Sequence, residues 1–95
     1  MDVIKLMPEY ECWPLWHSGP NNYDNIDPRF LGLSDKLVEE IENWAAVYDA
    51  TLDQDYPPNS AFKSSRDERL FADDGFSLAE KIYLKLTRRY QVIFK

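Results

Sequence analysis

The sequence has few of the residues that build metal centres, disulfide bridges and nucleotide-binding loops. Among its 95 residues there is one cysteine, Cys12, and one histidine, His17. A single thiol cannot form an intramolecular disulfide, and one thiol with one imidazole cannot complete a tetrahedral zinc site. The three glycines match neither a G-x-G-x-x-G nor a P-loop pattern. We therefore expect no bound metal, no cofactor and no nucleotide-binding loop.

Long apolar runs are also absent from the sequence. No stretch reaches the roughly 18 apolar residues typical of a transmembrane helix. The first residues lack the basic segment that opens a secretory signal peptide. A lone cysteine also suits a reducing compartment. We therefore expect a cytoplasmic protein that does not contact a membrane.

Two segments at the ends of the chain have the β-branched and large apolar residues typical of strands, namely 3–7 and 90–94. Residues 8–33 are rich in proline, glycine and asparagine and predict a long loop. Within this loop, residues 11–16 are a candidate strand. Proline cannot donate to a sheet ladder, so Pro14 would place that strand on an edge of the sheet.

Two amphipathic helices are expected in the middle of the chain. Ser34 is a favoured N-cap residue, and the apolar residues after it recur mostly at intervals of three and four, which predicts a helix over 35–53. Ser65 and Glu68 match an S-x-x-E capping box, which predicts a second helix over 66–88. The two apolar seams are Leu37, Ile41, Trp44, Ala45, Tyr48 and Leu52, and then Phe71, Leu78, Ala79, Ile82 and Leu86 with Gly75 on the same face.

This order of elements predicts a small α+β protein with a single domain over residues 1–95. With 44% hydrophobic and 15% aromatic residues, the chain can bury one modest core. The terminal strands are expected to pair with each other under the cover of the two helices. The sequence leaves open whether they run parallel or antiparallel, and it leaves the oligomeric state open.

The charge of the chain is acidic and asymmetric. Seventeen acidic residues against eleven basic ones give a net charge of −6. This charge repels phosphate backbones, so we expect no direct binding of nucleic acid. Residues 1–62 carry a net charge of −9 and residues 63–95 a net charge of +3. The excess acid therefore lies in the first two thirds of the chain.

An acidic stripe runs along the predicted first helix. At about 100° per residue, five carboxylates fall on the face opposite the apolar seam and span about 27 Å. They are Asp35, Glu39, Glu42, Asp49 and Asp53. Lys36 is the one base that we expect near enough to offset them. Because the stripe repels itself, it predicts either a partner of opposite charge or a surface that merely keeps the protein soluble.

Trp13 and Trp16 in the predicted loop are candidate binding residues, together with Tyr23, because Trp and Tyr are frequent at interface hot spots. The alternative is that they fill a small core. Cys12 and His17 would form a nucleophilic pair only if the fold brought them together. A small buried thiol and a surface imidazole are the commoner situation, so we expect no catalytic residues and no enzyme.

Six short patterns lie between residues 10 and 62: Tyr10-x-Cys12-x-Pro14-Leu15-Trp16, Asn25-Ile26-Asp27-Pro28, Leu31-x-Leu33-Ser34, Trp44-Ala45, Tyr48-Asp49-Ala50-Thr51-Leu52 and Pro58-x-Ser60-x-Phe62. In these patterns the chain resembles small acidic bacterial proteins, among them immunity proteins of contact-dependent growth inhibition and related toxin systems. Such proteins bind and neutralise a cognate toxin domain. Ala61 stands where the family pattern usually has glycine. The resemblance transfers no functional residue, because immunity families bind through surfaces that differ between members.

Together, the resemblance and the charge predict an immunity protein whose partner is a cognate, basic, nuclease-type toxin domain. The acidic stripe would imitate a run of phosphates, with Trp13 and Trp16 as anchors. The alternative is a small-molecule or regulatory binding module without catalytic activity, in which the loop aromatics line a pocket. Binding to a basic partner should weaken with salt, whereas binding in an apolar pocket should barely respond.

Overall fold

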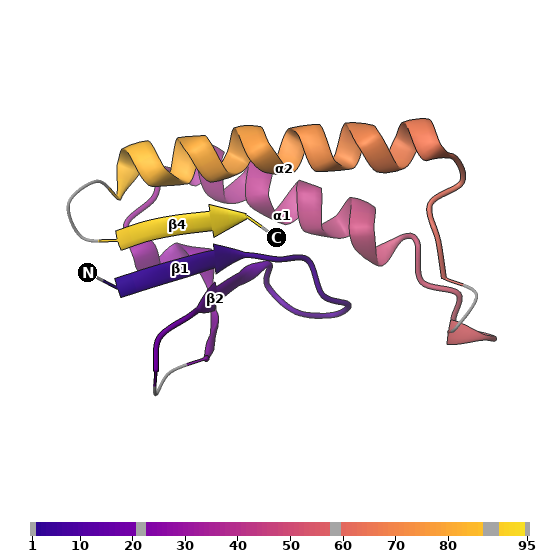
Figure 1. The fold of residues 1–95 in the computed structure, drawn as a ribbon, viewed down its shortest axis with the longest axis horizontal. Coiled ribbons are helices and arrows are strands. Elements are labelled where there is room, and N and C mark those ends of the chain that lie inside the picture. Colours follow the sequence, from indigo (N-terminus) through magenta and orange to yellow (C-terminus); the bar gives the residue numbers. More distant parts are fainter. Residues whose placement is uncertain (1, 21–22, 58–59, 87–89, 95) are drawn as a thin grey trace.

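The fold is a four-stranded mixed sheet packed against two helices (Figure 1). The computed structural model describes residues 2–20, 23–57, 60–86 and 90–94. The elements are β1 (Asp2–Leu6), β2 (Leu15–His17), β3 (Asn25–Ile26), the 3-10 helix η1 (Pro28–Leu31), α1 (Asp35–Asp49), α2 (Ser65–Lys85) and β4 (Tyr90–Phe94). The expected α+β class is confirmed. In the described part of the chain, no helix is both long and apolar enough to span a membrane.

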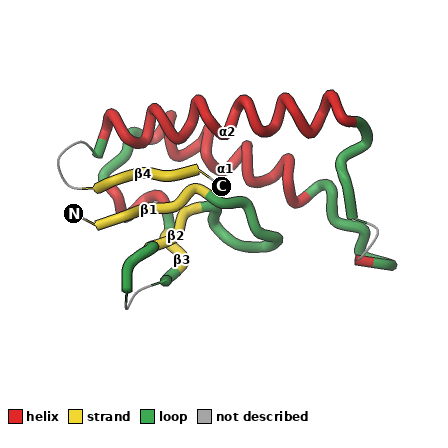
Figure 2. Tube along the Cα trace, in the orientation of Figure 1, coloured by secondary structure: helices red, strands yellow, loops and turns green. Residues whose placement is uncertain are grey.

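The terminal strands pair with each other, as the sequence predicts, with β1 inside the sheet and β4 at its edge, and the structure shows that they run parallel. The first strand lies one residue earlier than the predicted 3–7, and the last has the predicted bounds. The strand order is β3-β2-β1-β4. Ile4 of β1 lies opposite Val92 of β4, and Leu6 of β1 lies opposite Leu15 of the antiparallel strand β2. Parallel strands need a crossover connection. Both helices belong to this connection, and in Figure 2 they lie together along the sheet.

The predicted edge strand over residues 11–16 is wrong in its bounds and its place. β2 begins at Leu15 and lies between β1 and β3 inside the sheet. Pro14 precedes the strand, so its missing N–H costs no ladder bond. Its carbonyl oxygen still accepts a 2.8 Å hydrogen bond from the N–H of Met7. The edge of the sheet next to β2 is β3, a two-residue strand that the sequence did not predict.

Helix α1 ends at Asp49, so the predicted end at residue 53 is wrong. Thr51 turns the chain out of the helix, because its N–H and its hydroxyl both donate to the carbonyl oxygen of Tyr48, at 2.9 and 2.6 Å. The predicted start of α1 is confirmed, since the Ser34 hydroxyl oxygen accepts a 3.2 Å hydrogen bond from the N–H of Leu37.

Helix α2 begins one residue earlier than predicted. Its N-cap is Ser64, whose hydroxyl oxygen accepts a 3.0 Å hydrogen bond from the N–H of Asp67. The predicted capping box of Ser65 and Glu68 is therefore replaced by the preceding serine, because Ser64 has the extended backbone that an N-cap requires. The helix ends at Lys85, and the predicted end at residue 88 lies outside the described residues.

The core lies between the sheet and the helix pair. Ile4 and Leu6 of β1 are fully buried, and Ile41 and Ile82 from the two predicted seams meet them in the same cluster. Gly75 of α2 sits where three elements meet. A β-carbon at Gly75 would come within 3 Å of ring atoms of Phe94 and Trp44. The close approach predicted at this glycine is therefore made by β4 and α1.

Candidate functional site

A hollow of about 370 Å³ lies where the loop before β2 meets α1. Three carboxylates, from Glu11, Glu42 and Asp49, line it together with Trp13. We call it the acidic hollow. The rest of its lining is small or polar: Cys12, Pro14, Asn25, Ala45 and Ala46. The structure thus brings Trp13, predicted as a binding aromatic, next to Glu42 and Asp49, which the sequence predicted as part of the acidic stripe.

Asn25 holds Trp13 in place at the rim of the acidic hollow. Its side-chain amide donates to the carbonyl oxygens of Trp13 and Leu15, at 2.6 and 2.9 Å. Its amide oxygen accepts from the N–H of Trp13 at 3.1 Å. Because both main-chain groups of Trp13 are tied to one side chain, the indole is presented from a fixed backbone. This indole is 41% exposed, which leaves part of the ring available to a partner.

The loop is also fastened to α1 through Asp49. Glu11 has a φ of +60°, a left-handed conformation that is uncommon for residues other than glycine. Its N–H donates to Oδ1 of Asp49 at 3.1 Å. The Asp49 carboxylate therefore has a structural role, since it holds the turn of the loop against the last turn of α1.

The helical part of the acidic stripe extends from the acidic hollow toward the start of α1. Asp35, Glu39, Glu42 and Asp49 are all exposed, and their spacings of four, three and seven residues place them on one side of the helix over about 21 Å. Asp53 lies beyond the end of α1. It is half-buried, and its Oδ1 accepts from the N–H groups of Asp55 and Tyr56, both at 3.0 Å. Its carboxylate therefore caps a turn away from the stripe.

Arg29, in the short helix η1 that precedes α1, forms an ion pair with Asp27. The Arg29 guanidinium lies 2.6 Å from Oδ2 of Asp27. The hydrogen bond from Arg29 holds the pKa of the Asp27 carboxyl below its usual value. In turn Asp27, and more weakly Glu42, raise the pKa of Arg29. Glu42 is thus a stripe residue whose charge favours the charged form of Arg29. The expectation that Lys36 alone offsets the stripe stays a prediction.

Trp16 and Tyr23 lie apart from the acidic hollow. Trp16 is half-buried in β2, where its indole N–H donates to the carbonyl oxygen of Met7 at 3.0 Å. Tyr23 is 67% exposed. Neither lines the acidic hollow or the groove described below. Cys12 lines the hollow and His17 ends β2. Within the described residues, no three potential ligands gather into a metal site, and every buried side-chain nitrogen or oxygen has a hydrogen-bond partner.

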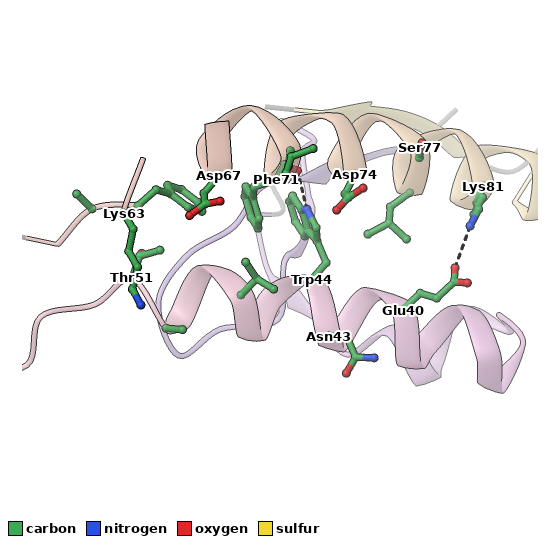
Figure 3. A pocket seen from close by; sticks show the side chains of 16 residues that line it. Glu40, Asn43, Trp44, Thr51, Lys63, Asp67, Phe71, Asp74, Ser77 and Lys81 are labelled. Atoms are coloured by element: carbon green, nitrogen blue, oxygen red, sulfur yellow. Dashed lines mark hydrogen bonds and ion pairs between the residues drawn. The ribbon is translucent and has the colours of Figure 1, made fainter. Parts of the chain in front are cut away.

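A second and larger concavity, of about 640 Å³, lies between α1 and α2; we call it the interhelical groove. Trp44 and Phe71 lie at its centre, and the Glu40–Lys81 ion pair, with an N–O distance of 3.2 Å, closes one end (Figure 3). Lys63 lies at the other end. This groove was not predicted from the sequence, because its lining comes from two helices and the segment before α2. Apolar residues off the predicted seams, such as Val47 and Leu70, were the available signal.

The arrangement of these surfaces is suited to binding a partner. The acidic hollow offers carboxylates and an indole face to a cationic side chain, a combination that attracts Lys or Arg through charge and cation–π contacts. Comparison with curated proteins gave no match. The model of the Serratia CdiI immunity protein-like family matches residues 2–95, nearly the whole chain. The chain therefore belongs to the Serratia CdiI immunity protein-like family.

Proposed function

We propose that this chain is a non-catalytic immunity protein that binds a cognate toxin domain in the cytoplasm and neutralises it. Membership of the immunity family supports the general role. The toxin's activity class rests on charge. The chain has a net charge of −6, and its first 62 residues carry −9. This negative charge suits a basic partner of the nuclease type.

The observation that carries this proposal is the composition of the acidic hollow. Glu42 and Asp49 from α1 and Trp13 from the loop line one concavity, and the stripe continues from it through Glu39 and Asp35. This row of carboxylates can pair with the basic residues of a toxin surface that binds phosphates. At one end of the row, the Trp13 indole can stack on a guanidinium group of the toxin. Complementary charge of this kind raises association rates up to about 10⁸ to 10⁹ M⁻¹s⁻¹ at low salt.

The alternative, a small-molecule or regulatory binding module, is favoured by a different feature. The interhelical groove has about 640 Å³, within the roughly 300 to 1,000 Å³ of common ligand clefts. The loop aromatics that were expected to form such a pocket do not line it, since Trp13 lies at the acidic hollow and Trp16 within the sheet. The two functions differ in their partner, so a toxin challenge separates them.

The experiment that tests the proposed function is a rescue assay. The partner toxin domain, sought first in the reading frame upstream of this chain's gene, is induced in bacterial cells with and without this chain. We expect growth to be restored by the wild-type chain, and the purified pair to form a 1:1 complex with a catalytically inactivated toxin domain. Continued growth arrest, with no complex at micromolar concentrations of both proteins, would contradict the proposal.

A further inference from the structure

The interhelical groove has an aromatic floor that the protein itself holds rigid. The indole N–H of Trp44 donates to the carbonyl oxygen of Phe71 at 2.9 Å, and the two rings stack with centroids 4.3 Å apart. Phe62, from the segment before α2, packs on Phe71 with centroids 5.1 Å apart. A floor fixed by these contacts needs little reordering when a partner binds, which favours affinity.

Apolar side chains also stand exposed at the mouth of this groove. Val47 of α1 is 53% exposed and Leu70 of α2 is 50% exposed, and both line the concavity. Leu84 on α2 is a useful contrast, because it is 60% exposed but does not line the groove. Exposed apolar residues around an aromatic floor are typical of a site for a large apolar side chain.

The charges along the rim of the groove indicate which residues of a partner would flank an apolar side chain bound there. Asp67 and Asp74 lie on the α2 side, seven residues or about 10 Å apart. In the described part of the chain neither carboxylate has an ion-pair partner, whereas Lys81 is held by Glu40. Among the residues that line the groove, Lys63 is the one remaining cation that can offset these two carboxylates. The α2 rim is therefore negative, and a basic residue next to the apolar anchor would complement it.

We infer that the interhelical groove receives a large apolar side chain of the cognate toxin, flanked by Lys or Arg residues that face Asp67 and Asp74. This inference rests on the proposed function and adds a second contact to it. The acidic hollow lies on one flank of α1 and the groove on the other, because Glu42, Ala46 and Asp49 line the first and Glu40 and Val47 the second. A toxin that occupies both straddles α1.

Two matched pairs of variants test the groove. Leu70→Ser removes an apolar rim residue, and Leu84→Ser makes the same change on the same helix outside the groove. Asp74→Lys reverses a rim charge, and Asp73→Lys reverses that of its exposed neighbour, which does not line the groove. Affinity for the inactivated toxin domain is measured by calorimetry, and folding by circular dichroism. All four sites are exposed, so the fold should survive.

We expect Leu70→Ser and Asp74→Lys each to weaken toxin binding about tenfold or more, and both controls to stay within about threefold of wild type. Equal affinities within each matched pair, while Glu39→Lys still weakens binding, would overturn the groove inference and leave the proposed function standing. Absence of binding by the wild-type chain would overturn both. If a groove variant loses its helical signal in circular dichroism, Ser77→Trp takes its place. The added indole obstructs the groove without removing a contact, so this variant should also weaken toxin binding.

Discussion

Trp44 and Phe71 join the two helices by a stacked pair of rings and by the hydrogen bond from the Trp44 indole to the Phe71 carbonyl oxygen. Trp44 is 4% exposed and also packs edge-on against Phe94 of β4. We expect Trp44→Ala to lower the free energy of unfolding by about 3 to 5 kcal/mol, the usual range for deleting a large buried aromatic side chain. Urea denaturation measures this change. A loss below about 1 kcal/mol would show that Trp44 does not join the helices in this way.

Gly75→Ala tests how closely α2 approaches β4 and α1. Alanine is favoured over glycine in a helix by about 1 kcal/mol, so an open site would be stabilised. Here the added methyl would lie within 3 Å of the Phe94 and Trp44 rings, and overpacking costs about 1 to 3 kcal/mol. We therefore expect a net loss of stability and a lower melting temperature. Ser77→Ala, at an exposed position of the same helix, is the control and should not lower it.

The Asp27–Arg29 pair predicts a dependence of stability on pH. The pKa of Asp27 is lowered mainly by the hydrogen bond from the Arg29 side chain. A carboxylate with a lower pKa in the folded state stabilises the fold above its unfolded pKa, and this contribution is lost as the pH falls through the folded pKa. Asp27→Asn should therefore be less stable than wild type at neutral pH, and the difference should shrink below about pH 4. Thermal unfolding at several pH values measures both, and a difference that stays constant with pH would contradict this account.

The sequence predicted the parts of the fold that depend on local periodicity. The presence of both helices and both terminal strands and the burial of Trp44 are confirmed. The predicted cap Ser34 is confirmed for α1, whereas Ser64 and not Ser65 caps α2. The end of α1 was missed because the tether between Thr51 and Tyr48 outweighs an apolar pattern that continues to Leu52. The parallel direction of β1 and β4 could not be predicted, because it depends on how the whole connection packs.

The acidic hollow was only partly visible in the sequence. Helical spacing identified Glu42 and Asp49 on one face, but the position of Trp13 beside them depends on Asn25, twelve residues away. The contribution of Glu11 depends on its left-handed backbone, for which no glycine gave a signal. The sequence therefore identified residues on separate elements, and only the structure shows that Trp13 lies beside Glu42 and Asp49.

The central claim is that the acidic stripe on α1 meets the toxin. Glu39 and Glu42 are the stripe residues to reverse, because Asp49 also holds the loop and Asp35 opens the helix, where a negative charge stabilises the helix dipole. The matched control reverses Asp73 and Glu80, which are exposed on α2 and line neither concavity. Both double variants change the net charge equally, and exposed charges contribute little to folding.

The most direct test measures the dissociation constant of the inactivated toxin domain for wild type and both double variants, at about 50 mM and about 500 mM salt. We predict that Glu39→Lys with Glu42→Lys weakens binding about 100-fold at low salt, that the loss shrinks at high salt, and that the Asp73 and Glu80 control stays within about tenfold of wild type. Equal affinities and equal salt dependences for the two double variants would contradict the claim and show that the toxin binds elsewhere.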